Sequence, residues 1–361
     1  MSASALDLVR EDLRDFGGYA SARREAVAAS IHLDANENPW PNAADAAGRC
    51  RRYPAAQSMA LRDALADLHG VAPARLLPCR GSDEAIDLLV RALCRPGRDA
   101  VIISTPTFGM YAISARLHGA PVIDVPLCDG AGGFSLDIPA VITAARRSEA
   151  RLVFVCSPGN PTGHGVRPAD LAMLAAGLAG KAAVVVDEAY GEFSSVASAL
   201  ALLASHDNLL VLRTLSKAHA LAGARVGCVI GDPALVGLLG HCQAPYPLAT
   251  PAVELALAAL APAARERTEA CVRAVCIERE RMTRALGRAA GVRRVHPSQG
   301  NFLLVRFAAA ADVWRRLLAA GVQVRDQRGV PGLADALRIS VGTREENDRV
   351  LRAIGAAEQA P

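Results

Sequence analysis

Short runs of consecutive apolar residues alternate with helical stretches through the middle of the chain, from about residue 80 to residue 229. Apolar residues at successive positions are typical of strands that are buried on both faces. Six segments have this character, namely DAVIISTP, PVIDVPL, ARLVFVCSP, AAVVVDEAY, NLLVLRTLS and ARVGCVIG. Strands that alternate with helices predict an α/β fold, with a mainly parallel sheet covered by helices. DGAGGF at 129–134 predicts a loop or a hairpin turn.

The two ends of the chain have a different character. Residues 1–30 predict a polar helix, and the proline-rich end of the next segment predicts an extended arm. After Pro251, an Arg- and Glu-rich helix is predicted over about 252–290, followed by NFLLVRF, a helix around Trp314 and ALRISVGT. We therefore predict an N-terminal helix and arm (1–43), a large domain (44–251) and a smaller α+β domain (252–361).

Composition places the chain among packed globular proteins. It has 361 residues, of which 52% are hydrophobic and 21% charged, so it can bury a large core and is not intrinsically disordered. Lys plus Arg number 40 and Asp plus Glu number 36, a net charge of +4. This small surplus favours neither nucleic acid nor an acidic membrane as a partner.

The cysteines indicate a reducing compartment. There are nine of them, without any C-x-x-C pair, which fits neither a zinc site nor a disulfide framework. We expect reduced and mostly buried thiols in a cytoplasmic protein. The charged N-terminal residues do not resemble a signal peptide, and the prolines in the charge-free run at 233–253 argue against a membrane span. The eight histidines show no metal-binding spacing, so no metal is expected.

Polar side chains follow the predicted strands at the points where the strands end. Asn160 follows one strand, Asp187 and Tyr190 the next, and Ser216, Lys217 and Arg225 a third, while Gly81, Ser82 and Asp83 begin a helix. Ligands of open α/β sheets bind at the carboxyl ends of the strands, so we expect these groups to converge. Only two lysines are present, Lys181 and Lys217, and Lys181 is expected to be solvated where it precedes a strand.

This set of groups matches the requirements of pyridoxal phosphate. An amine can bind the aldehyde, a carboxylate the ring nitrogen, an amide and a phenol the ring oxygen, and a helix N-terminus with an arginine the phosphate. Asp187 ends the most apolar strand, where an unpaired charge is costly, so it needs a cationic partner. The cofactor's ring nitrogen is one candidate, and a structural arginine is the alternative.

The spacing of Asn160, Asp187, Tyr190, Lys217 and Arg225 resembles that of the fold-type-I pyridoxal-phosphate aminotransferases. This resemblance implies their fold, a large domain with a mainly parallel seven-stranded sheet covered by helices and a smaller α+β domain. Nine segments in order are similar to the histidinol-phosphate aminotransferases among them, and the resemblance runs from about residue 19 to residue 349. The segments are RYPAAQ, RGSDEAIDLLVRALCRPG, PTFGMY, SPGNPTG, DEAYGEF, RTLSKAHALAGARVG, APYPLATP, VRDQ and LRISVGTREEN.

The resemblance implies a role for each matched residue. Lys217 would attach the cofactor and move the substrate proton, Asp187 would bind the ring nitrogen, and Asn160 and Tyr190 would bind the ring oxygen. The remaining cofactor contacts implied are Gly81, Ser82, Asp83, Ser216 and Arg225 at the phosphate, Phe108 stacked on the ring, and Tyr53 from a second subunit. The implied substrate contacts are Tyr19, Asn36, Arg325 and Arg338.

Several of these assignments have alternatives. The carboxylate of Asp83 is expected to cap the helix rather than touch a phosphate. Tyr53 could be a surface turn residue before Pro54, and Arg325 an ordinary surface arginine. Gly159 stands where the family often has asparagine, and we expect it to loosen that loop.

The resemblance implies a homodimer with a shared active site that transfers the amino group of L-histidinol phosphate to 2-oxoglutarate. An aromatic amino-acid aminotransferase and a decarboxylase of a phosphorylated amino acid remain alternatives. A regulator built on this fold would need a DNA-binding domain ahead of it, and few residues precede the first matched segment.

Overall fold

A seven-stranded sheet forms the centre of the computed structural model, which describes residues 4–18 and 31–356. Its strands are β1 (Leu76–Cys79), β2 (Val101–Ile103), β3 (Val122–Asp124), β6 (Leu152–Cys156), β7 (Ala183–Asp187), β8 (Leu209–Thr214) and β9 (Gly227–Ile230). Their order is β1-β9-β8-β7-β6-β2-β3, and only β9 runs antiparallel to its neighbours. The predicted mainly parallel sheet is confirmed. The sequence pattern missed β1, which is short and contains a proline.

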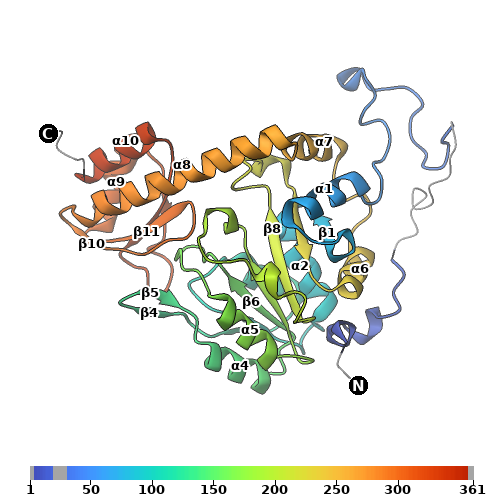
Figure 1. Cartoon of the computed structure of the whole chain (residues 1–361), viewed down its shortest axis with the longest axis horizontal. Helices are drawn as coiled ribbons and strands as arrows, with labels where there is room; N and C mark the ends of the chain where they lie inside the picture. Colours follow the sequence, from blue (N-terminus) through green and yellow to red (C-terminus); the bar gives the residue numbers. More distant parts are fainter. Residues whose placement is uncertain (1–3, 19–30, 357–361) are drawn as a thin grey trace.

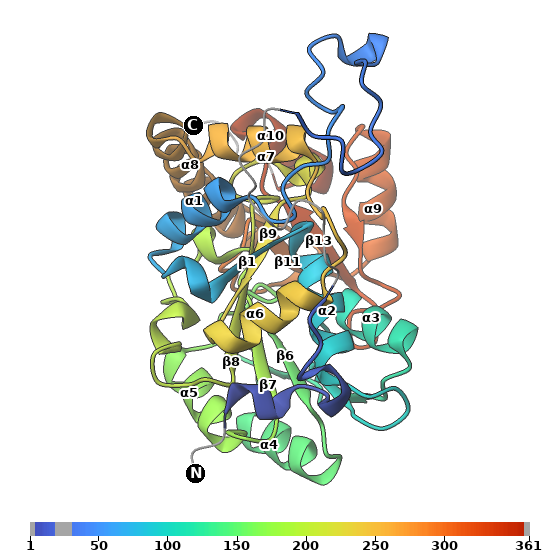
Figure 2. The ribbon, with the colours of Figure 1, turned by 90° about the vertical axis from the view of Figure 1, so that its right-hand side faces the viewer.

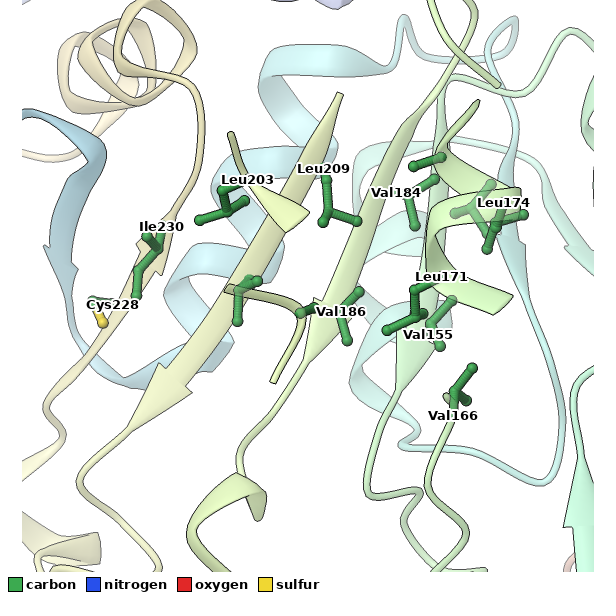
Figure 3. Close-up of a cluster of buried hydrophobic side chains, with 14 of the residues drawn as sticks. Val155, Val166, Leu171, Leu174, Val184, Val186, Leu203, Leu209, Cys228 and Ile230 are labelled. Atoms are coloured by element: carbon green, nitrogen blue, oxygen red, sulfur yellow. The ribbon is translucent and has the colours of Figure 1, made fainter. Parts of the chain in front are cut away.

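Successive strand residues enter two separate hydrophobic cores, one on each face of the sheet. Val184 and Val186 of β7 belong to the first core, and Val185 between them belongs to the second. Figure 3 shows the first core, where side chains of β7 meet Leu171 and Leu174 of a covering helix. This alternation explains the unbroken apolar runs in the sequence, because both faces of each strand are buried.

Helices cover both faces of the sheet, as predicted. The first core includes residues of α1 (Met59–His69), α4 (Ile138–Arg147), α5 (Pro168–Gly177) and α7 (Thr250–Ala259). The second core includes residues of α2 (Gly81–Leu93), α3 (Met110–His118) and α6 (Pro233–Cys242). Figure 2 shows α1 and α5 on one side of the sheet and α2 and α3 on the other.

The C-terminal part of the chain forms a smaller α+β unit. Its antiparallel sheet has the order β10-β11-β13-β12, with β10 (Val292–Val295), β11 (Phe302–Phe307), β12 (Arg325–Asp326) and β13 (Ala336–Ser340). Three helices accompany it, α8 (Pro262–Gly287), α9 (Ala310–Ala319) and α10 (Arg344–Ile354). Figure 1 shows α8 reaching from α7 to this unit. The single helix predicted over 252–290 is wrong, because the chain breaks at Leu260 and Ala261 and restarts with Pro262 in the first turn of α8.

A hairpin of β4 (Cys128–Gly130) and β5 (Gly133–Ser135) connects the two units and confirms the turn predicted there. Asp129 on the hairpin pairs with Arg294 at 3.0 Å and with Arg306 at 2.9 Å, both in the small unit. Figure 1 shows the hairpin below β10 and β11.

The predicted N-terminal helix is wrong for residues 4–18. This segment contains two 3-10 helices, Ala5–Leu8 and Glu11–Leu13, and the backbone N–H of Arg10 donates to the carbonyl of Ala92. Leu8 and Val9 are buried in the second core, so contacts with α2 and α6 replace the helical hydrogen bonds. Further 3-10 helices lie at Ala43–Asp45, Pro73–Arg75, Gly191–Phe193, Ala199–Leu202 and Ala222–Ala224.

All nine cysteines are free thiols. Four are buried, namely Cys79, Cys94, Cys156 and Cys228, whereas three are exposed, namely Cys50, Cys128 and Cys271. The expectation that most are buried is therefore wrong. Over the described ranges, no helix combines the length and apolar character needed to cross a membrane.

Candidate active site

A cavity of about 470 Å³ opens where three parallel strands end. Cys156, Asp187 and Thr214, the last residues of β6, β7 and β8, all line it. Nine of the lining residues, Asp187 among them, were predicted from the sequence to contact the cofactor. They are Ser82, Asp83, Phe108, Asn160, Asp187, Tyr190, Ser216, Lys217 and Arg225. The structure thus brings most of the predicted cofactor contacts together at the predicted edge of the sheet.

Asp187 is a buried carboxylate with hydrogen bonds but no ion pair among the described residues. Its side chain is 1% exposed, its Oδ2 accepts from the Tyr111 hydroxyl at 2.8 Å, and its Oδ1 accepts from the Ala189 N–H at 3.0 Å. Burial raises the pKa of Asp187 to about 6, although the Tyr111 hydrogen bond acts in the opposite direction. The sequence left open a structural arginine as the partner of Asp187. Within the described residues, the nearby Arg213 and Arg225 pair with Glu188 and Asp83 instead.

Lys217 lies just after β8 and faces the same cavity. Its side chain is exposed to the cavity, yet the surrounding protein displaces enough water to lower its pKa, and the positive charge of Arg338 lowers it further. Its Nζ lies 5.6 Å from the centre of the Tyr190 ring. A lowered pKa increases the share of neutral amine, which is the nucleophilic form.

Asn160 and Tyr190 connect the cavity to the small unit. The Asn160 amide Nδ2 donates to the Tyr190 hydroxyl at 3.4 Å, and Arg338 on β13 donates to the Asn160 Oδ1. The Arg338 guanidinium also lies over the ring of Phe302, at 5.5 Å. Arg325 is the cross-strand partner of Arg338, but its side chain is exposed. The small unit therefore places one arginine at the edge of the cavity and a second beside it.

The start of α2 and the segment after β8 form the other end of the cavity. Arg225 donates to Asp83 at 2.8 Å and to Ser216 at 3.5 Å. The expectation that Asp83 caps α2 is wrong, because the carboxylate turns to this guanidinium and the N-cap Arg80 makes no side-chain cap. A hydroxyl, a guanidinium and a helix N-terminus together suit a phosphate.

Gly81 allows this close approach. Its φ is +74°, and a Cβ there would lie 2.7 Å from the Arg225 Nη2. Any other residue would be strained in this conformation and would push Arg225 away from the helix start.

Two of the residues expected to contact the cofactor or the substrate lie away from this cavity. Tyr53 and Asn36 line a separate cavity of about 730 Å³ beside the arm. Tyr53 is 51% exposed, and its ring stacks on Tyr246 with 4.6 Å between ring centres. Figure 2 shows the arm projecting away from the body of the molecule. Tyr19 lies outside the described residues.

The loop at Gly159 is tightly held, contrary to the looser loop expected. The Gly159 N–H donates to the His164 carbonyl at 2.7 Å, and the Gly163 N–H donates to the Gly159 carbonyl at 2.6 Å. A Cβ on Gly159 would collide with the side chains of His164 and Thr162, which bond to each other at 2.6 Å. The glycine thus makes room for a local side-chain pair that closes the loop.

Sequence reasoning gave no role to four residues at this site. Cys156, Ala189 and Thr214 line the cavity, and Tyr111 donates to Asp187 from behind it. The strand-end position could have identified Cys156 and Thr214. For Tyr111 the only signal was its place in the matched segment PTFGMY. Within 4–18 and 31–356, no group of three or more histidine, cysteine and acidic side chains could hold a metal.

The raised pKa of Asp187 makes a testable contribution to stability in the cofactor-free protein. Below about pH 4 the carboxyl is protonated in both folded and unfolded chains, so its burial carries no charge penalty. As pH rises from about 4 to about 6, the unfolded chain ionises first and the folded state loses stability relative to it. Asp187→Asn should therefore gain stability over the wild type across this range, by up to about 3 kcal/mol at pH 7.

Urea denaturation of both cofactor-free proteins at several pH values from 4 to 8 measures this difference. Buried histidines such as His164 contribute equally to both proteins and cancel. Asparagine makes different hydrogen bonds from aspartate, which shifts the free energy of unfolding by the same amount at every pH. Comparing the stability difference at pH 4 with that at pH 7 removes this constant shift. A difference that stays the same at every pH would contradict a buried, high-pKa carboxyl.

Comparison with known proteins gives one consistent result. Residues 19–354 match the family of class I and II aminotransferases. The chain is 57% identical over 361 residues to a histidinol-phosphate aminotransferase of Xanthomonas euvesicatoria, covering 100% of this chain and 99% of the relative. It is 57% identical over 355 residues to one of Stenotrophomonas maltophilia, covering 98% of each chain.

A solved structure agrees with these sequence relatives. The histidinol-phosphate aminotransferase of Sinorhizobium meliloti in complex with pyridoxal-5'-phosphate is 26% identical, with a TM-score of 0.77 over 89% of this chain and 88% of that one. The match in sequence spans nearly the whole chain, and the match in fold covers 89% of it. This chain therefore belongs to the class I and II aminotransferase family.

Proposed function

We propose that this chain is a pyridoxal-phosphate-dependent aminotransferase of histidine biosynthesis. It would convert L-histidinol phosphate and 2-oxoglutarate to 3-(imidazol-4-yl)-2-oxopropyl phosphate and L-glutamate. The relatives at 57% identity over the full length carry this name. The observation that carries the proposal is a buried carboxylate that forms no ion pair within the described residues, Asp187, in one cavity with a lysine of lowered pKa, Lys217.

The residues of the cavity fit pyridoxal phosphate. Asp187 has unused acceptor capacity in a buried site, which suits the protonated ring nitrogen. Asn160 and Tyr190 offer donors for the ring oxygen O3′, and Phe108 offers an apolar ring surface. The phosphate would be held by Ser82, Asp83, Ser216 and Arg225. The backbone N–H groups of the first turn of α2, which begins at Gly81, would add further donors. Asp83 would act there by orienting Arg225.

Each catalytic residue has a task that follows from its chemistry. When bound, the cofactor supplies a ring that absorbs the electron pair left at the substrate Cα. Asp187 would keep a proton on the ring nitrogen, and Tyr190 would donate to O3′. Lys217 would take the proton from Cα and return it at C4′, acting as general base and then as general acid. Its lowered pKa increases the share of neutral amine for the first step.

Arg338 would bind the anionic group of both substrates. Its guanidinium fork fits the carboxylate of glutamate and the phosphate ester of histidinol phosphate alike. It reaches the cavity from β13 and is held there through Asn160 and Phe302. Arg325, its cross-strand neighbour, would add positive charge near the same anion.

Arg338→Ala should reduce kcat/KM at least about tenfold for each substrate, because a charge-assisted contact contributes about 1.5–3 kcal/mol. Arg338→Lys should restore part of the loss, since a point ammonium cannot form the fork. Arg325→Ala is the matched control on the neighbouring strand and should have a smaller effect, because its side chain is exposed. Single-turnover spectroscopy of each half-reaction measures both. An unchanged glutamate half-reaction in Arg338→Ala would contradict a shared anion site.

Steady-state assays with 2-oxoglutarate as acceptor test the proposed reaction. Histidinol phosphate should be used with a far higher kcat/KM than phenylalanine, and no carbon dioxide should be released from phosphorylated amino acids. A preference for phenylalanine would instead assign an aromatic amino-acid aminotransferase. Release of carbon dioxide without consumption of a keto acid would assign a decarboxylase.

We also propose that the enzyme is a cytoplasmic homodimer whose active site is completed by the arm and by Tyr53 of a second copy. Several large apolar side chains of the arm are exposed, with Ile31 at 74%, Leu33 at 84% and Trp40 at 75%. Such exposure in a contiguous segment is typical of an interaction surface. In that assembly Asn36 and Tyr19 would contact the substrate, and the domain boundaries at 44 and 252 would separate the arm, the cofactor domain and the small domain.

A further inference from the structure

Tyr111 is fixed behind Asp187 by aromatic packing on two sides. It lies in the first turn of α3 and is 0% exposed. Its ring stacks face to face on Phe154 of β6, with 4.6 Å between ring centres and 4° between planes, and meets Phe108 edge to face at 5.6 Å. This packing holds the ring in place, and its hydroxyl lies 2.8 Å from the Asp187 Oδ2.

The Tyr111 hydroxyl is the only side-chain donor to this carboxylate over the described ranges. The other donor is the backbone N–H of Ala189, which binds Oδ1. Burial raises the pKa of Tyr111 well above its usual value, so the phenol stays protonated and keeps donating. Each oxygen of the Asp187 carboxylate thus accepts one hydrogen bond from these donors and has capacity to accept another.

A neutral donor suits this position better than a cation would. An arginine or lysine behind Asp187 would neutralise its charge and weaken its hold on a protonated ring nitrogen on the cavity side. A phenol orients the carboxylate and stabilises its ionised form while leaving the full negative charge for the cavity. It also offsets part of the penalty of burying that charge.

We propose, on the basis of the function proposed above, that Tyr111 is a positioning residue that holds the Asp187 carboxylate ionised and aimed at the ring nitrogen of the cofactor. It would act through Asp187 and would not touch the cofactor or the substrate. The two aromatic neighbours, Phe154 and Phe108, keep the hydroxyl at the required place.

Other titratable groups surround Asp187, and one of them, Cys156, also interacts with the Tyr111 side chain. Asp83 on α2 and Glu188 beside Asp187 both disfavour its ionised form through their negative charge. Cys156 ends the neighbouring strand, and burial raises the pKa of its thiol to about 12, so it stays neutral. Lys217 faces Asp187 across the cavity and favours its ionised form.

Tyr111→Phe removes the hydroxyl and keeps the ring stack. In the cofactor-free protein, the Asp187 carboxyl can be titrated by ¹³C NMR with labelled aspartate, with Asp187→Asn identifying the signal. We expect the pKa of Asp187 to be higher in Tyr111→Phe than in the wild type. In the loaded protein, the affinity for pyridoxal phosphate should fall about tenfold or more, and the ¹⁵N shift of the labelled ring nitrogen should move toward the unprotonated form.

Phe154→Leu is an intermediate variant, because it keeps the hydroxyl but loosens the ring stack that places it. It should destabilise the protein while changing the Asp187 titration less than Tyr111→Phe does. If Tyr111→Phe fails to fold, 3-fluorotyrosine placed at position 111 provides a stronger donor and should lower the pKa of Asp187 instead.

An Asp187 titration and a ring-nitrogen shift identical to the wild type in Tyr111→Phe would overturn the proposal. So would a fluorotyrosine protein in which the Asp187 titration stays unchanged. Failure of the proposed function would look different. The wild type itself would then not bind pyridoxal phosphate, whereas the carboxyl titration of the cofactor-free protein would still test the hydrogen bond.

Discussion

Lys217→Ala should abolish transamination and covalent attachment of pyridoxal phosphate. Lys217 is the lysine that lines the cavity, and its lowered pKa increases the share of the neutral amine that both attachment and proton transfer need. General acid–base catalysis alone contributes about 10²–10⁴ in rate. The wild-type protein should be yellow because of the bound cofactor, and Lys217→Ala should lack the absorbance band of the covalently attached cofactor. Borohydride reduction followed by peptide mass mapping should place the cofactor on Lys217.

Lys181→Ala is the matched control, since these are the only two lysines of the chain. Lys181 is exposed at the start of the segment that leads into β7, on a different part of the sheet from the cavity residues. Its removal should leave the absorbance and the rate unchanged. A borohydride-stable label on Lys181 would show that the site has been assigned to the wrong lysine.

Asp187→Asn should slow removal of the Cα proton by about 10²–10³, the usual loss when a preorganised electrostatic group is removed from an active site. An amide keeps the shape of the side chain but cannot hold the ring nitrogen in its protonated form. The cofactor should still bind through its phosphate and ring oxygen, because Arg225, Ser216 and Asn160 are unchanged.

Single-turnover kinetics with Cα-deuterated substrate measure this step directly. The isotope effect should rise in Asp187→Asn, because proton removal becomes more strongly rate-limiting. Near-normal turnover with an unchanged isotope effect would contradict the role of Asp187 in keeping the ring nitrogen protonated. The same variant should gain stability without the cofactor, so the residue that activates the ring also destabilises the empty fold.

The sequence predicted the sheet and the strand-end residues for a physical reason. The run VVVD is buried on both faces until Asp187, so the position where the apolar pattern stops also marks the edge where ligands bind. The hydrogen bond between Tyr111 and Asp187 joins residues 76 positions apart, and the pair of Asp83 and Arg225 spans 142 positions. No local pattern encodes such contacts, so the role of Tyr111 was missed and Asp83 was misread as a cap.

Local errors have equally specific causes. The N-terminal segment has residues that suit a helix, but the hydrogen bond from Arg10 to Ala92 and the burial of Leu8 favour short turns against the body of the protein. The break between α7 and α8 could have been read from Pro262, since proline is favoured in a first helical turn. Tertiary contacts overrode the local preference in the first case, whereas in the second the local signal was present.

The ion pairs of Asp129 have a consequence for how reaction rates can diverge among related enzymes. Asp129 does not line the cavity, but it binds Arg306 on β11, the strand next to β13, which carries Arg338. A displacement of about 1 Å at a reacting group can cost a factor of about 100 in rate. Substitutions in the hairpin can therefore act on the position of Arg338 relative to Lys217 through β11. Two relatives with identical cavity residues can in this way differ in rate.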